Sequence, residues 1–232
     1  MTALLSRSLG VLKLDQGRDT EETYAFGSVQ GAGSADSAVI TETVEGAWAE
    51  RVVRGDPALE QAYVAAAKRL VERGAVAISS NCGFTIRHQT AVSSSVHVPV
   101  AMSSLLLLPT LIRQSPPSTK IAVLTYDSTC FDEDLLGLQD PAEKARIVVG
   151  GIEGSKYWHD ERKHPAPPTD VAAMEADVSA CIVRLRAAHP DIGIILFECA
   201  GFPLVAPAIR RITQLPVYDI TVLRRMLMAS LS

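Results

Sequence analysis

The 232-residue sequence is poor in the features that mark nucleic-acid binders and membrane proteins. Aromatic residues make up 5% of the chain, no run of Lys and Arg occurs, and the formal net charge is −4. Nucleic-acid binders usually carry a basic patch, so this balance argues against a nucleic-acid partner and against an anionic membrane surface. The densest apolar stretch, residues 105–112, is interrupted by Pro109 and is far shorter than the ~20 residues of a membrane-spanning helix.

Cysteines are also few, and residues 1–14 lack the pattern of an export signal. Residues 1–14 contain no continuous apolar core followed by a small-residue cleavage site, so no signal peptide is expected. We therefore predict a soluble, cytoplasmic protein whose four cysteines are reduced thiols rather than a disulfide framework. Apolar residues, in contrast, are plentiful: 47% of the chain is hydrophobic, enough for a sizeable buried core.

Short apolar segments alternate with helical patterns along the chain. Asp56 and Pro57 predict the start of a helix, because an Asp N-cap and a Pro at the first helical position stabilise that end. Gly74 marks the end of this helix, a longer helix is predicted over 171–188, and the polar, Pro-rich residues 153–169 are expected to form a loop. The predicted strands are residues 9–14, 38–44, 75–80, 96–101, 121–125, 146–149, 192–197 and 217–218. This alternation predicts an α/β fold with mostly parallel sheets flanked by helices.

The two halves of the chain repeat one pattern. Residues 75–84 and 193–202 each form an apolar strand, followed by a cysteine with Gly and Phe close behind it. Cys82 and Cys199 are each followed 17 residues later by a proline that precedes a valine. We therefore predict two pseudo-symmetric α/β lobes. They comprise residues 1–116 and 117–232, with the C-terminal helix packing back on the first lobe.

The repeat also predicts where chemistry takes place. Ligands of parallel sheets bind outside the carboxyl ends of the strands, and both cysteines follow a strand there. A thiolate can remove the proton on the carbon α to a carboxylate, and a thiol on the opposite face can return one. The unperturbed thiol pKa of ~8.5 is expected to be lowered by the helices that follow each cysteine. We therefore expect Cys82 and Cys199 to face each other across a cleft between the lobes, with no metal or cofactor.

Ser-Asn-Cys-Gly-Phe at 80–84 and Leu-Phe-Glu-Cys-Ala at 196–200 resemble the motifs of the aspartate/glutamate racemase superfamily. The resemblance covers nearly the whole chain and is greatest to an uncharacterised bacterial branch. There is also some likeness to the dimethylsulfoniopropionate lyases and arylmalonate decarboxylases of that superfamily. It implies cofactor-independent catalysis by Cys82 and Cys199, with Tyr126 donating to the substrate carboxylate or enediolate. The racemases usually carry Cys-Asn-Thr and Cys-Thr-Glu where this chain has Cys-Gly-Phe and Cys-Ala-Gly.

The predicted substrate-binding residues lie beside the two cysteines or after the first strand of each lobe. They are Asn81, Gly83, Phe84, Ala200, Gly201, Thr125, Tyr126, Ser128, Thr129, Asp15 and Arg18. The histidines and acids of residues 159–164 have no spacing typical of a zinc site, so no metal is predicted.

These residues favour a cofactor-independent racemase or isomerase that acts α to a carboxylate. Two alternatives remain open on the same scaffold: a lyase or decarboxylase, and a non-catalytic protein that binds small carboxylates. A redox dithiol is less favoured, because a substrate carbon between the sulfurs demands a gap. The expected partner is a small carboxylate-bearing substrate. Relatives of this kind often form dimers, so a homodimer is an expectation by analogy. Which cysteine acts as base stays open.

Overall fold

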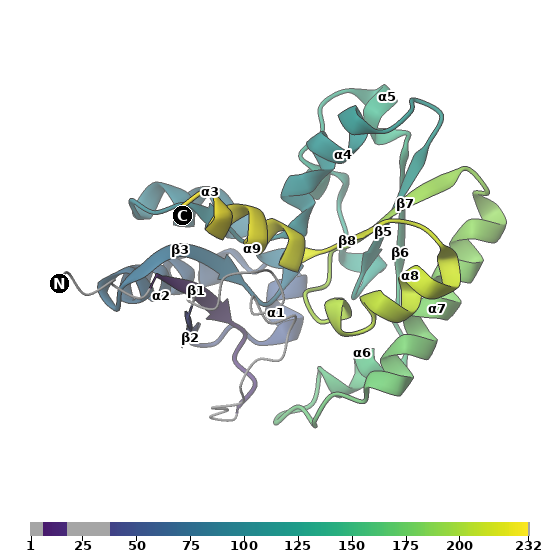
Figure 1. The fold of residues 1–232 in the computed structure, drawn as a ribbon. Coiled ribbons are helices and arrows are strands. Elements are labelled where there is room, and N and C mark those ends of the chain that lie inside the picture. The colour runs from purple at the N-terminus through teal and green to yellow at the C-terminus, as the bar shows by residue number, and fades with distance from the viewer. Residues whose placement is uncertain (1–6, 18–37, 232) are drawn as a thin grey trace.

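The structure, a computed structural model, describes residues 7–17 and 38–231 and consists of two α/β lobes (Figure 1). Each lobe holds a four-stranded, all-parallel sheet, which confirms the predicted fold class. The first sheet has the order β2-β1-β3-β4, with β1 Ser8–Lys13, β2 Ala38–Thr43, β3 Ala75–Ser80 and β4 Val100–Ala101. The second has the order β6-β5-β7-β8, with β5 Lys120–Thr125, β6 Ile147–Gly151, β7 Ile192–Phe197 and β8 Val217–Tyr218.

The internal repeat is visible in the hydrogen bonds of the two sheets. The Ile78 N–H donates to the Pro99 carbonyl at 2.9 Å, and the Ile195 N–H donates to the Pro216 carbonyl at 3.0 Å. Both pairs of central strands, β1 with β3 and β5 with β7, shift register after their first residue pair. The two lobes therefore share strand order and local geometry.

Helices cover both sheets, as expected for parallel strands. Those of the first half are α1 Ala49–Val53, α2 Glu60–Glu72, α3 Gln89–Ser95 and α4 Leu108–Gln114, with the 3₁₀ turns η2 Pro57–Leu59, η3 Gly83–His88 and η4 Ser104–Leu107. Those of the second half are α5 Pro141–Lys144, α6 Lys156–Asp160, α7 Val171–Ala188, α8 Ala206–Thr213 and α9 Ile220–Ala229, with the 3₁₀ turns η5 Ser128–Cys130, η6 Glu133–Leu136 and η7 Phe202–Leu204.

Two segments differ from the sequence-based expectation. The strand expected over 96–101 is reduced to β4, which begins directly after Pro99, a residue without the N–H that a strand interior needs. The expected loop over 153–169 contains the short helix α6. This helix begins there because the Ser155 hydroxyl accepts a hydrogen bond from the Trp158 N–H at its N-cap.

Each lobe receives a contact from a segment of the other half. The C-terminal helix α9 lies against β3 and β4 of the first lobe (Figure 1), and Arg224 donates to the Ser80 carbonyl at 2.7 Å. In return, the Ser104 hydroxyl at the start of η4 donates to the Phe197 carbonyl of the second sheet at 2.6 Å. Ser80 and Phe197 both stand two residues before a predicted catalytic cysteine. The exchanged segments thus bind the strand ends that carry the cysteines, while the division of the chain at residue 116 stays a prediction.

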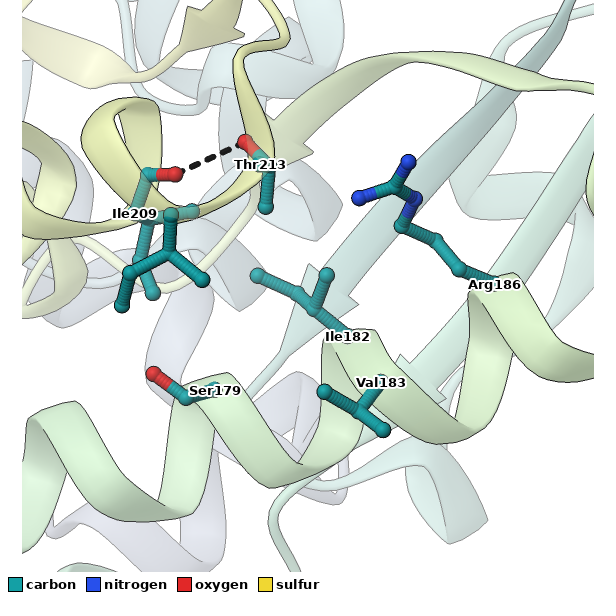
Figure 2. Close-up of a pocket in the computed structure, with 7 residues that line it drawn as sticks. Ser179, Ile182, Val183, Arg186, Ile209 and Thr213 are labelled. Atoms are coloured by element: carbon teal, nitrogen blue, oxygen red, sulfur yellow. Dashed lines mark hydrogen bonds between the residues drawn. The ribbon is translucent and has the colours of Figure 1, made fainter.

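The outer surface of the second lobe carries a shallow apolar groove of about 240 Å³ between α7 and α8 (Figure 2). Its rim includes Val183 and Ile212, which are 64% and 58% exposed, and Arg186 is the one charged residue among those that line it. Both catalytic candidates lie elsewhere. No helix within 7–17 and 38–231 is long and apolar enough to span a membrane.

Candidate active site

Cys82 and Cys199 occupy equivalent positions at the carboxyl ends of β3 and β7. The residue before each cysteine is hydrogen-bonded to the neighbouring central strand. The Asn81 N–H donates to the Leu12 carbonyl at 3.0 Å, and the Glu198 N–H donates to the Leu124 carbonyl at 2.8 Å. Both cysteines are free thiols and partly exposed. In contrast, Cys181 is buried in α7, as expected for a core residue.

The loops that carry the two cysteines touch each other. Gly83 packs so closely against Glu198 that an added methyl group would lie 2.1 Å from the Glu198 carbonyl oxygen and 2.4 Å from its Oε1. Real Cβ atoms do not approach other atoms within 3.0 Å, so only glycine fits at position 83. The residue after the first cysteine therefore contacts the residue before the second, as the two-lobe hypothesis requires.

Both thiols are held in their protonated form. Burial raises the pKa of Cys82, and the charge of Glu198 adds to the effect. Burial likewise raises the pKa of Cys199, with smaller contributions from Glu198 and from Cys82 itself. Backbone N–H groups of Phe84 and Thr85, beside Cys82, lower its pKa, but by less than burial raises it. The expectation that the following helices lower the thiol pKa is therefore wrong in its net direction, because desolvation outweighs the N–H donors.

Glu198 is the residue that the sequence analysis missed. Its side chain is buried, and its Oε2 accepts a hydrogen bond from the Thr125 hydroxyl at 2.8 Å. Its Oε1 has no hydrogen-bond partner among the described residues. Burial raises the pKa of Glu198 to about 7, although hydrogen bonds from Thr125 and from the Tyr126 N–H oppose this. A charged residue directly after the wholly apolar Ile-Ile-Leu-Phe of β7 was the signal that could have identified it.

Arg87 was also missed and adds a cation to the site. Its Nη2 donates to the Cys130 carbonyl at 3.0 Å and to Asp132 at 3.1 Å, so it links η3 to the loop after β5. Its Nε is buried without a hydrogen-bond partner within the described part of the chain. Arg87 also lowers the pKa of Glu198, against the larger upward effect of burial. A donor that is buried and unused is a candidate contact for an anionic ligand.

Several predicted substrate contacts gather around the cysteines. Phe84 and Phe202 are fully buried, and Tyr157 approaches the backbone at Gly201, where an added methyl would lie 2.5 Å from the Tyr157 hydroxyl. Ala200 is buried beside them. These residues form an apolar wall around the two thiols.

The polar groups nearest this wall are already paired. Thr125 donates to Glu198, and the Tyr126 hydroxyl donates to the Trp158 carbonyl at 2.6 Å. The Asn81 side-chain oxygen accepts from the Leu14 N–H at 2.9 Å. Tyr126 would therefore have to exchange its present hydrogen bond in order to donate to a substrate.

Three other predicted contacts also make hydrogen bonds within the protein. Ser128 donates to Glu153 at 2.7 Å, and Thr129 donates to Asp127 at 2.5 Å. Asp15 accepts from the N–H groups of Gly17 and Gly46 at 3.1 and 3.2 Å. Their role as substrate contacts stays a prediction. Arg18 lies outside the described residues.

No group of three or more His, Cys, Asp and Glu side chains that could hold a metal ion occurs within residues 7–17 and 38–231. The histidines of the 159–164 segment are engaged with aromatic rings instead. His159 packs edge-on against Trp158 with ring centroids 4.9 Å apart, and His164 packs against Trp48 at 4.0 Å.

Dimethylsulfoniopropionate lyases are among the curated proteins that this chain resembles. Dimethylsulfoniopropionate lyase 2 of Emiliania huxleyi is 31% identical over 257 residues, which cover 95% of this chain and 71% of the relative. The lyase of Durusdinium sp. clade D is 33% identical over 155 residues, 64% of this chain and 50% of the relative. This chain spans 34% to 63% of the length of the first five curated relatives. No protein-family model matches the chain.

Solved structures with the same fold come from the superfamily that the motifs resemble. Glutamate racemase from Francisella tularensis aligns with a TM-score of 0.62 at 13% identity, over 97% of this chain and 81% of its own. A variant of arylmalonate decarboxylase aligns with a TM-score of 0.56 at 18% identity, over 91% of this chain and 87% of its own. These likenesses confirm the fold and leave the choice of reaction to the site.

Proposed function

Because the chain belongs to the dimethylsulfoniopropionate lyase family, within the aspartate/glutamate racemase superfamily, we propose that it is an enzyme that removes the proton on the carbon α to a carboxylate. The observation that carries this proposal is the contact between the two cysteine loops at Gly83 and Glu198. In the proposed site, the thiols of these two loops hold a small acid between them.

The specific reaction we propose is β-elimination from dimethylsulfoniopropionate or a related sulfonium acid. One cysteine thiolate takes the α-proton, the electron pair forms the carbon–carbon double bond, and the bond from the β-carbon to sulfur breaks. The products are acrylate, dimethyl sulfide and one proton. The curated relatives support this choice, because they align with up to 97% of the chain at 28–33% identity.

We assign Arg87 to the carboxylate of the substrate. It is a half-buried cation whose charge acts on Glu198, and its Nε is buried with no hydrogen-bond partner among the described residues. An arginine can hold a carboxylate and stabilise the charge that develops on it as the α-proton leaves. The apolar wall formed by Phe84 and Phe202 excludes water from the same site and strengthens that interaction.

Racemisation is the second candidate, and one observation favours it. The two cysteines stand at equivalent positions of two equivalent lobes, so each can address one face of a planar intermediate. A racemase needs this arrangement, because the proton must leave one face and return to the other.

The test is incubation in D₂O with a panel of sulfonium acids, amino acids, hydantoins and malonates. Elimination releases dimethyl sulfide, measured by headspace gas chromatography, and acrylate, measured by NMR. Racemisation instead places deuterium at the α-carbon without fragmentation. Binding without either reaction would support the carboxylate-binding alternative and overturn the proposal.

Cysteine variants provide the control for this test. Cys82→Ser and Cys199→Ser are each expected to lower kcat/KM by ~10²-fold or more, as for loss of a general acid or base. Cys181→Ser removes a thiol buried in α7, away from the site, and should leave the reaction unchanged. A full reaction rate in either site variant would exclude thiol catalysis.

A further inference from the structure

The two lobes are equivalent in backbone but not in the residue that precedes each cysteine. Asn81 and Glu198 make the same backbone hydrogen bond to the neighbouring strand, at 3.0 and 2.8 Å. Their side chains also correspond, because the Asn81 amide oxygen accepts from the Leu14 N–H and the Glu198 carboxylate accepts from the Tyr126 N–H. A neutral amide thus stands in one lobe where an ionisable carboxyl stands in the other, so the two thiols have different neighbours.

The Glu198 carboxyl points toward the opposite lobe. Its Oε1 lies against the backbone of Gly83, the residue that follows Cys82. This oxygen is buried and has no hydrogen-bond partner within the described part of the chain. A buried carboxyl oxygen without a partner is costly, so a role in the chemistry explains why it is there.

We propose that Glu198 takes the thiol proton of Cys82, which makes Cys82, rather than Cys199, the base that attacks the substrate α-proton. This inference rests on the proposed function and assigns the roles within it. Glu198 acts through Cys82 and does not touch the substrate.

The proton transfers balance over one turnover. The proton on Cys82 Sγ moves to Glu198 Oε1, which leaves a thiolate and a neutral carboxyl. The thiolate takes the α-proton of the substrate as the leaving group departs, and Cys82 is again a thiol. Glu198 then releases its proton to solvent, so the net product is the one proton that elimination requires.

The groups around Glu198 fit this role. Burial makes both thiols hard to ionise without a nearby acceptor, and it raises the pKa of the Glu198 carboxyl to about 7. The charged and titratable groups that face the carboxyl or the two thiols are Arg87, Cys82, Cys199, Tyr63, Tyr126, Tyr157 and Glu161. Of these, only Arg87 is a cation, and it favours the ionised carboxylate that can accept a proton.

The test is the pH dependence of Cys82 alkylation by iodoacetamide, followed by peptide mass spectrometry and requiring no substrate. In the unaltered protein the rate is expected to rise in two steps, the first near pH 7 as Glu198 becomes able to accept the proton. Glu198→Gln should remove that first step, and Glu198→Asp, which keeps a carboxyl, should retain it. Glu153→Gln is the matched control, because it removes an exposed carboxylate of the same lobe and should leave both steps in place.

The same variants are then compared in the enzymatic reaction. Loss of the proton acceptor is expected to lower kcat/KM of Glu198→Gln by ~10²–10⁴-fold at pH 7 and to abolish the rising limb of its pH profile. An alkylation profile with no step near pH 7, or an identical step in Glu198→Gln, would overturn the inference. A normal step without turnover of any tested substrate would instead overturn the proposed function alone.

Discussion

Gly83→Ala is the sharpest perturbation of the contact between the two lobes. The added methyl would lie 2.1 Å from the Glu198 carbonyl oxygen, whereas ordinary contact begins at 3.4 Å. The difference means that the loops must separate by about 1.3 Å. The obstructing atom belongs to the backbone at the end of β7, so it cannot rotate away as a side chain can.

A separation of this size predicts a large loss of activity and a smaller loss of stability. Misplacement of reacting groups by ~1 Å can cost ~10²-fold in rate, so kcat/KM should fall by about that factor. Overpacking costs ~1–3 kcal/mol in the free energy of unfolding, which most α/β domains of this size tolerate. The assay is dimethyl sulfide release together with urea unfolding followed by circular dichroism.

Gly193→Ala is the matched control, since it adds the same methyl group on β7, the strand that leads to Glu198. There the methyl meets Thr119 Cγ2 at 2.8 Å, the end of a side chain that can move. It should lower stability without lowering kcat/KM beyond about two-fold. Wild-type rates in Gly83→Ala, with unchanged unfolding, would refute the view that the two loops form one site.

Three further predictions concern stability, each measured by urea unfolding. Arg224→Met removes the donor to the Ser80 carbonyl at 2.7 Å. Hydrogen bonds from charged groups contribute ~1.5–3 kcal/mol, so the free energy of unfolding should fall by about 2 kcal/mol. No change would refute the role of α9 in holding β3. Ser104→Ala removes the 2.6 Å bond to the Phe197 carbonyl and should cost ~1 kcal/mol, whereas no loss would mean that water replaces the hydroxyl. Folding raises the pKa of the Glu198 carboxyl from 4.5 to about 7. The contribution of this carboxyl to the free energy of unfolding is therefore full below pH 4.5 and is lost as the pH rises through 7. At ~1.36 kcal/mol per pKa unit this is about 3 kcal/mol, and Glu198→Gln should show a correspondingly flatter pH profile; equal slopes would contradict the raised pKa.

Long, regular elements were the most predictable parts of the fold. Helix α7 and strands β3 and β7 have the bounds expected from the sequence, because their apolar patterns are continuous and their ends carry Asp170 or a polar residue. Short elements were less predictable. The strand expected over 96–101 is reduced to its last two residues, because Pro99 interrupts it.

The candidate site was predictable as far as local position decides it. Cys82 and Cys199 are identified by their repeated spacing and by following a strand, and both are properties of short segments. Asp15, Ser128 and Thr129 share that position at strand ends, yet their side chains already make hydrogen bonds to other residues of the protein. Position in the chain therefore predicted which loops meet better than it predicted which side chains are free to bind a ligand.

The sequence alone determined the class of fold, the duplication and the pair of cysteines, because strand periodicity and repeat spacing are local and need no knowledge of the partner lobe. Only the tertiary structure decided that Gly83 meets Glu198 and that burial, rather than the N–H donors, controls the protonation of the thiols. These are contacts between residues more than 100 positions apart, and their energies depend on how much water the assembled lobes exclude.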